Sequence, residues 1–259
     1  MNSTTHRYAL ITGASSGIGA ACAEQMAARG INLILLARRA ENLYATATRL
    51  RNLYKIDVHP MAVDVTDYHA VQKMILNLPV DCQIIDILIN NAGLAAGLDR
   101  FQQASMHDWE AMIDTNIKGL LYITRAVLPG MIERNNGHIV NIGSVAGHQS
   151  YIGGSVYSAT KAAVTRISEG LRLDLNGSKG SKIRVTSIDP GMVESEFSLV
   201  RFKGDAERAK QVYQGMTPLK PEDVADAVMY SITRPAHVNI AEMILYPTDQ
   251  ASATVVHRS

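Results

Sequence analysis

The chain has 259 residues, of which 47% are hydrophobic and 19% charged, a balance typical of a folded globular protein. Its net charge of +1 gives no basic excess for nucleic acid. Two cysteines, Cys22 and Cys82, are too few for a disulfide framework, which favours a reducing compartment. No apolar run approaches the ~18 residues of a membrane span, and residues 1–8 lack the apolar stretch of a secretory signal. We therefore expect a cytoplasmic protein whose partners are neither nucleic acid nor membrane.

Short apolar runs alternate along the chain with longer helical patterns. Near-continuous apolar runs indicate strands covered on both faces, as in a parallel sheet. The alternation predicts a single α/β domain over residues 1–259, with a doubly wound parallel sheet and right-handed crossovers. The expected strands are residues 8–12, 31–37, 58–65, 84–90, 137–143, 183–189 and a short seventh at 243–246. The expected helices are residues 17–29, 40–53, 68–78, 108–134, 155–177 and 221–233, the last with Pro221 at its first position.

Residues 193–219 interrupt this alternation. A long irregular insert late in a doubly wound sheet is usually a lid over the substrate, and the alternative is a structural loop. We expect residues 193–219 to form a substrate lid.

A glycine-rich turn follows the first strand and opens the first helix. Side chains there would keep the backbone away from a ligand, and the free N–H groups of the helix attract a pyrophosphate. This placement predicts a dinucleotide site in a fold of the Rossmann type. The residues concerned are Gly13, Ser15, Ser16, Gly17, Ile18 and Gly19.

Arg38 and Arg39 follow the second strand. An NAD site would place an acidic residue near this point to hold the ribose 2′-hydroxyl, whereas two guanidinium groups suit the 2′-phosphate of NADP. The alternative is that both arginines are solvated residues at a helix start. We predict NADP as the cofactor.

Two further strand ends lie at the same edge of the predicted sheet. Asp64 and Val65 close the third strand, where Asp64 can accept a hydrogen bond from the adenine amino group. Asn91 lies in residues 90–93, where small residues let the backbone pack against the cofactor and amide side chains can bond buried main chain. We expect these residues to line the cofactor site.

Ser144, Tyr157 and Lys161 are the candidate catalytic residues. Tyr157 and Lys161 lie four residues apart in a predicted helix and share one face of it. A nearby lysine cation stabilises a phenolate and lowers the tyrosine pKa from its ordinary value of about 10, so Tyr157 can exchange a proton with an alcohol or carbonyl. Ser144 can hydrogen-bond the reacting oxygen. Alone, such a Tyr–Lys pair is usually a surface pair, but beside a dinucleotide turn it predicts a hydride-transferring oxidoreductase.

These motifs, in this order and spacing, resemble the short-chain dehydrogenase/reductase family over almost the whole chain. The resemblance implies that Tyr157 and Lys161 also contact the cofactor. It implies that Asn116 holds a water molecule that links Lys161 to solvent as a proton relay. It further implies that the segment with Pro190, Gly191, Val193 and Ser195 meets the nicotinamide carboxamide. Ser195 stands where the family more usually has threonine.

Residues 196–205, 235–240 and 256–258 are similar to the NADP-dependent serine, allo-threonine and 3-hydroxy acid dehydrogenase subgroup. That resemblance implies oxidation of the 3-hydroxyl of a small hydroxy acid, or reduction of the 3-oxo acid. It also implies a homotetramer, with the long helices near Asn116 and Tyr157 at the subunit contacts.

A carboxylate substrate needs a cation, and Arg201 in the expected lid is our candidate. Lys203 and Arg258 are the alternatives, and His148 is a candidate for the pocket wall. The histidines show no metal-ligand spacing, so we predict no metal. Two other functions stay open: a broad carbonyl or 3-oxoacyl thioester reductase, and a non-catalytic NADP(H)-binding regulator on the same fold.

Overall fold

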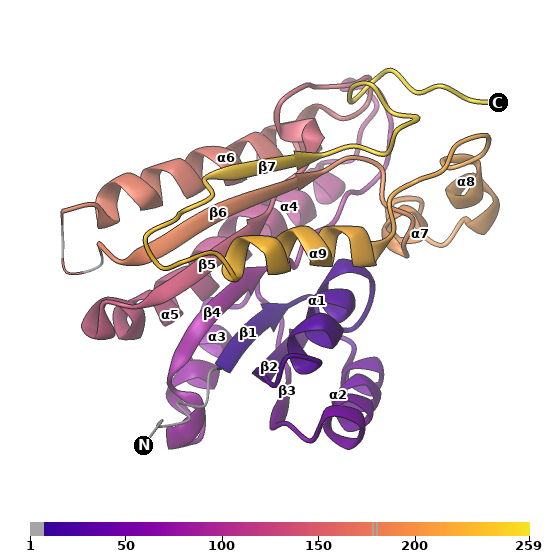
Figure 1. The fold of residues 1–259 in the computed structure, drawn as a ribbon. Helices are drawn as coiled ribbons and strands as arrows, with labels where there is room; N and C mark the ends of the chain where they lie inside the picture. Colours follow the sequence, from indigo (N-terminus) through magenta and orange to yellow (C-terminus); the bar gives the residue numbers. More distant parts are fainter. Residues whose placement is uncertain (1–7, 178, 180) are drawn as a thin grey trace.

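A seven-stranded parallel sheet with helices on both faces forms the centre of the protein in a computed structural model (Figure 1). The structure describes residues 8–177, 179 and 181–259. Residues 1–7, which carry most of the prediction about a secretory signal, lie outside the described residues. The strand order is β3-β2-β1-β4-β5-β6-β7, which confirms the predicted doubly wound sheet.

The strands follow the predicted apolar runs closely, because their side chains are covered on both faces. Every residue of β1, β2, β4 and β5 is buried. The third strand ends at Ala62 rather than at residue 65, because Asp64 turns its carboxylate to the backbone N–H and hydroxyl of Thr66, at 3.0 and 2.9 Å. The strands are β1 Tyr8–Thr12, β2 Asn32–Ala37, β3 Val58–Ala62, β4 Ile85–Asn90, β5 Gly137–Ile142, β6 Ile183–Pro190 and β7 Glu242–Leu245.

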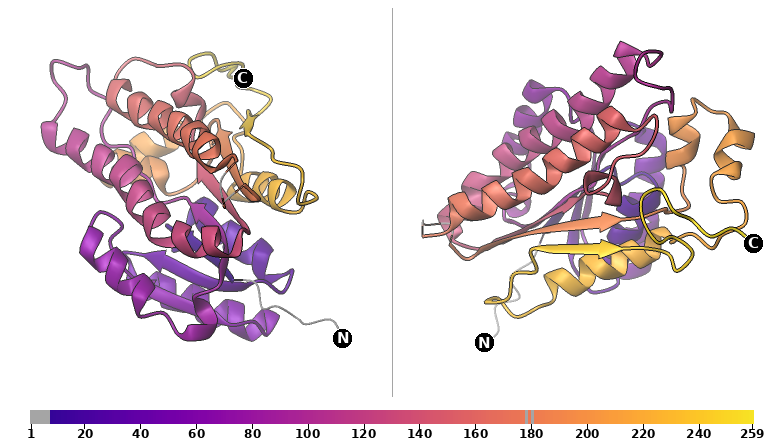
Figure 2. Two further views of the ribbon diagram at one scale, coloured as in Figure 1. Left: turned by 90° about the vertical axis from the view of Figure 1, so that its left-hand side faces the viewer. Right: turned by 90° about the horizontal axis from the view of Figure 1, so that it is seen from above.

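The helices form a layer on each face of the sheet, as Figure 2 shows. The helices α1, α2 and α9 pack on one face, and α3, α5 and α6 pack on the other with α4 beside α6. The helix α9 begins at Pro221, as predicted. The bounds are α1 Gly17–Ala27, α2 Ala40–Tyr54, α3 Tyr68–Leu76, α4 Met106–Ile113, α5 Leu120–Arg134, α6 Ser155–Leu175 and α9 Pro221–Ile232, with short 3-10 turns η1 Val80–Cys82 and η3 Val145–Gly147.

The single helix predicted over residues 108–134 is instead three consecutive segments. A π-helical turn, η2 Asp114–Gly119, separates α4 from α5. A π turn adds one residue to the helix without ending it, so the apolar pattern on either side still looks continuous in the sequence. Such turns are frequent at functional sites, and this one contains the buried Asn116.

The insert at residues 193–219 is more regular than predicted. It contains α7 Phe197–Arg201 and α8 Ala206–Gln211, and Val193 pairs with Leu219 at its base. Helices of five and six residues are too short to show a helical period in the sequence. Figure 1 shows both helices beyond the end of the sheet, near the C-terminal tail.

Within the described residues, no helix combines the length and the apolar character needed to cross a membrane.

Candidate active site

A cavity of about 340 Å³ opens at the carboxyl ends of the strands, along the line where the chain order of the sheet changes between β1 and β4. Open α/β sheets bind ligands at this position. The cavity wall brings together predicted residues from across the chain: Gly13, Ser15, Ser16, Gly17, Ile18, Arg38, Arg39, Asp64, Val65, Asn91, Ser144, Tyr157, Lys161, Pro190, Gly191, Val193 and Ser195.

The glycine turn is held open by close packing against the end of β4. Gly13 has a φ of +67°, and a Cβ there would lie 2.8 Å from Asn91 Nδ2. That amide nitrogen donates to the carbonyl of Thr12 at 2.9 Å, so the predicted bond from Asn91 to main chain is confirmed. Gly19 does not line the cavity; a Cβ there would overlap the carbonyl oxygen of Gly13, so this glycine lets α1 approach the turn.

Positive charge gathers at one end of the cavity. Nη2 of Arg39 donates to Ser16 Oγ at 2.7 Å, to Ser15 Oγ at 3.3 Å and to Glu196 Oε2 at 2.8 Å. This guanidinium lowers the pKa of the Glu196 carboxyl. Arg38 is 63% exposed and lies 3.9 Å from Asp64. A glycine cradle that ends at two guanidinium groups fits a dinucleotide with a 2′-phosphate.

The predicted catalytic residues meet at the other end of the cavity. Tyr157 is buried on α6, and Nζ of Lys161 lies 5.9 Å from the centre of its ring. That ammonium donates to the carbonyl of Ile142 at 2.9 Å. Ser144 Oγ donates to Pro190 O at 3.5 Å and accepts from the backbone N–H of Ala146 at 3.1 Å. These contacts fix the hydroxyl beside the tyrosine.

Burial dominates the protonation of this pair. Loss of solvent raises the pKa of Tyr157, and the nearby Tyr151 adds to that rise. A hydrogen bond from Ser144 and the charge of Arg201 act in the opposite direction. Burial lowers the pKa of Lys161 to about 8, against the attraction of the Asp189 carboxylate.

Asn116 holds the backbone beside the lysine. Its Oδ1 accepts from Leu94 N–H at 2.8 Å, and its Nδ2 donates to Leu94 O at 2.9 Å and to Thr160 Oγ1 at 3.0 Å. A Cβ on Gly93 would lie 3.2 Å from Asn116 Oδ1 and 3.5 Å from Lys161 Nζ. Asn116 and Lys161 therefore approach each other across a residue with no side chain.

The three cations proposed for a substrate carboxylate have different surroundings. Lys203 pairs with Asp108 at 2.9 Å, and Arg258 donates to the carbonyls of Val212, at 3.0 Å, and Gln214. Arg201 also does not line the cavity itself, but its guanidinium carbon lies 5.6 Å from the centre of the Tyr157 ring.

Sequence reasoning missed two aromatic residues near Tyr157, of which Phe197 lines the cavity. The ring of Phe197 on α7 lies 5.8 Å from that of Tyr157, and the ring of Tyr151 lies 5.2 Å from the guanidinium carbon of Arg201. Tyr151 lies in the loop before α6, and Phe197 begins the short helix α7. No spacing in the sequence marks them.

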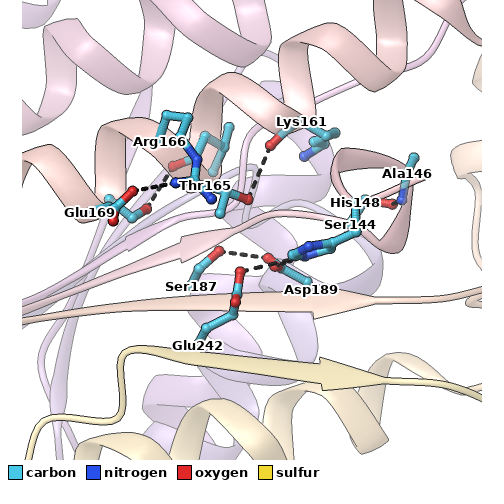
Figure 3. Close-up of polar contacts among 12 residues, drawn as sticks. Ser144, Ala146, His148, Lys161, Thr165, Arg166, Glu169, Ser187, Asp189 and Glu242 are labelled. Carbon is cyan, nitrogen blue, oxygen red and sulfur yellow. Dashed lines mark hydrogen bonds and ion pairs between the residues drawn. The ribbon is translucent and has the colours of Figure 1, made fainter. Parts of the chain in front are cut away.

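His148, a candidate for the pocket wall, does not line the cavity. Figure 3 shows it turned toward Asp189 and Glu242, with Nε2 2.6 Å and 3.4 Å from their carboxylate oxygens. The carboxylate of Asp189 is fully buried and draws the imidazole away from the cavity. Among the residues that the structure describes, this is the one group of three possible metal ligands with ligand atoms within 4.8 Å of one another. That no metal binds stays a prediction.

A dinucleotide-sized cleft that ends at a buried Ser–Tyr–Lys group defines an oxidoreductase of alcohols and carbonyl compounds. A family model described as short chain dehydrogenase matches residues 7–205. The chain belongs to the short-chain dehydrogenase family, as its motifs predict.

Individual relatives are similar over nearly the whole chain. The NADP-dependent 3-hydroxy acid dehydrogenase YdfG of Salmonella typhi is 49% identical over 252 residues, 96% of this chain and 99% of that protein. The NADP-dependent 3-hydroxy acid dehydrogenase of Schizosaccharomyces pombe is 43% identical over 250 residues, 96% of this chain and 95% of that protein. The closed form of a serine dehydrogenase complexed with NADP+ has a TM-score of 0.90 at 47% identity, covering 97% of this chain and all (100%) of that one. The predicted NADP dependence agrees with all three.

Proposed function

We propose that this protein oxidises the 3-hydroxyl group of small 3-hydroxy acids such as serine, allo-threonine and 3-hydroxypropionate with NADP+, and reduces the corresponding 3-oxo acids in reverse. The names of the relatives support the reaction. The observation that carries the substrate class is Arg201, the lid cation that faces the ring of Tyr157. A carboxylate bound there leaves the 3-hydroxyl of the same small molecule within reach of the tyrosine.

The cofactor would lie along the cavity described above. The glycine turn and Asn91 would hold the pyrophosphate side, Arg38 and Arg39 the 2′-phosphate, and Asp64 and Val65 the adenine. When bound, NADP supplies the hydride acceptor for the alcohol and, when reduced, the hydride donor for the carbonyl compound. The nicotinamide end would meet a segment that lines the catalytic end of the cavity and contains Pro190, Gly191, Val193 and Ser195.

Tyr157 acts as the proton acceptor in oxidation and the proton donor in reduction. Ser144 hydrogen-bonds the substrate oxygen and stabilises the negative charge that develops on it. Lys161 stabilises the phenolate and holds the nicotinamide ribose. Asn116 reaches toward Lys161 across Gly93, which suits the role of holding a water molecule in a proton relay to solvent.

One edge of the Arg201 guanidinium forms hydrogen bonds within the protein, and the other edge is available to a substrate carboxylate. Nε donates to Gly97 O at 3.2 Å, and Nη2 donates to the hydroxyl of Tyr151. Nη1 has no hydrogen-bond partner within residues 8–177, 179 and 181–259. The hydrogens of Nη1, with the second one of Nη2, form the fork that binds a carboxylate through two parallel bonds.

Kinetics on a matched pair of substrates test this proposal. The substrates are 3-hydroxybutanoate and its methyl ester, measured at a pH where the rate no longer depends on pH. Arg201→Ala should raise KM for the acid roughly ten- to a hundredfold, because a bond to a charged group is worth about 1.5–3 kcal/mol. The ester should be spared at that pH. A native enzyme that uses both substrates equally well, with no effect of Arg201→Ala on KM, would instead support a broad carbonyl or thioester reductase.

The family resemblance also supports a homotetramer in the cytoplasm. Ile113 and Leu121, on the helices that flank the π turn, are 39% and 42% exposed in the single chain. Apolar side chains that a neighbouring subunit covers are exposed in this way when one subunit is considered alone. Cys22 and Cys82 are both free and buried, which suits a reducing compartment.

A further inference from the structure

We propose that Arg201 is also a positioning residue for the base: carried by the lid, its guanidinium acts with Lys161 to stabilise the phenolate of Tyr157. This inference rests on the proposed role of Tyr157 in proton transfer and is independent of the carboxylate site. The geometry is nearly equal for the two cations. The guanidinium carbon of Arg201 lies 5.6 Å from the centre of the tyrosine ring, and Nζ of Lys161 lies 5.9 Å from it.

A second cation matters here because the first one is weakened by its own burial. Tyr157 is buried, and a buried phenolate is costly without positive charge beside it. Burial lowers the pKa of Lys161 to about 8, so this ammonium holds its proton less firmly than a lysine in water does. A guanidinium, by contrast, stays charged. Arg201 therefore keeps its effect on Tyr157 where that of Lys161 fades.

Arg201 is held over the ring by two other segments, the loop between β4 and α4 and the loop before α6. Its Nη2 donates to the hydroxyl of Tyr151, and its backbone carbonyl accepts from Gly97 N–H at 3.0 Å. Tyr151 itself packs on the chain that leads into α6. Its ring lies so close to Gly154 that a Cβ on this glycine would overlap it. The cation is thus tied to the start of the helix that carries Tyr157, although it comes from the lid.

Several elements present titratable or polar groups to Tyr157. The helix α6 contributes Lys161, the end of β5 contributes Ser144, the loop before α6 contributes Tyr151, and α7 contributes Arg201. The β6 carboxylate of Asp189 acts one step away, because it favours the charged form of Lys161. Of the groups that act directly on Tyr157, Arg201 is the one delivered by the lid, so lid closure and activation of the base occur together.

The pH dependence of kcat/KM for an uncharged substrate tests this inference. Oxidation of methyl 3-hydroxybutanoate needs deprotonated Tyr157, so the rate is lost as the pH falls through the pKa of the base. Arg201→Gln should move this acid limb to higher pH by about one pH unit, the effect of one charge at this distance in a partly shielded site. Reduction of methyl 3-oxobutanoate needs protonated Tyr157, and its alkaline limb should move upward as well.

Matched variants separate an electrostatic role from a structural one. Arg201→Lys keeps the charge and should return the limb toward the native position. Lys203→Gln removes another lid cation, one that pairs with Asp108, and should leave the limb where it is. The same rates are measured with methyl 3-hydroxybutanoate deuterated at its carbinol carbon. A slower rate with the deuterated ester verifies that hydride transfer limits kcat/KM.

A lower plateau in Arg201→Gln with an unmoved acid limb would overturn the inference, and so would an equal shift in Lys203→Gln. The carboxylate site is judged separately. If KM for the hydroxy acid is unchanged in Arg201→Ala while the limb for the ester moves, the proposed substrate class fails and the electrostatic role stands.

Discussion

The two arginines at the adenosine end offer a test of cofactor choice whose size follows from the structure. Three contacts of Arg39 use the single nitrogen Nη2, and its Nη1 and Nε have no hydrogen-bond partner in the part of the chain that the structure describes. A 2′-phosphate can therefore bind Nη1 or Nε without breaking the pair with Glu196. A hydrogen bond to a charged group is worth about 1.5–3 kcal/mol, so Arg39→Ala should weaken NADPH binding roughly ten- to a hundredfold.

Arg38 should contribute less, because it is 63% exposed and its nearest acidic oxygen is 3.9 Å away. Its removal should cost about 1 kcal/mol, or roughly fivefold in affinity. NADH lacks the 2′-phosphate and should bind almost equally to the native protein and the variants. Fluorescence titration with NADPH and NADH measures both dissociation constants without turnover.

The loss of NADPH affinity compared with the loss of NADH affinity decides whether the arginines bind the 2′-phosphate. Equal losses for NADPH and NADH would show that the arginines support the fold of the cleft rather than the phosphate. Glu196→Gln is the control for the ion pair across the cleft mouth. An exposed pair of this kind is worth about 0–1 kcal/mol, so the control should change NADPH affinity by no more than roughly fivefold.

The remaining predictions concern the base and the packing behind it. Tyr157→Phe removes the hydroxyl and keeps the ring, so kcat should fall by roughly 10²–10⁴-fold while NADPH still binds in the same titration; near-native turnover would contradict the mechanism. Gly143→Ala should lower the free energy of unfolding by about 1–3 kcal/mol in denaturant titration, because the added Cβ would overlap the buried carboxylate of Asp189. Gly170→Ala on α6 meets nothing within 4 Å and should not destabilise the protein; equal effects at the two glycines would refute the steric argument.

Features with a local physical cause could be predicted from the sequence. The buried strands show as apolar runs because both faces of a parallel sheet are covered. The turn at Gly13 can be recognised because its backbone, with a φ of +67°, favours glycine. Tyr157 and Lys161 show because one helical turn places them on the same face. Each signal lies within a few residues of the feature that it predicts.

Features that depend on distant segments could not be predicted. The partners of His148 come from the end of β6 and the start of β7, so no spacing of histidines could reveal the group. The π turn at Asn116 inserts one extra residue into the helix, a change too small to disturb the spacing of apolar residues in the sequence. The choice among three basic residues for the substrate carboxylate also needed coordinates, because only their partners distinguish them.

Those partners divide the work of the lid among separate residues. In the proposed lid, Lys203 forms an ion pair with Asp108 on α4, and Arg258 of the C-terminal tail donates to two carbonyls. Neither cation is then available to a substrate without breaking these contacts. Arg201 is attached through Nε and one Nη2 hydrogen, which leaves the Nη1 side of its guanidinium without a partner in the described residues. Because these contacts belong to different residues, we expect a substitution at position 201 to change substrate preference while the contacts of Lys203 and Arg258 remain in place.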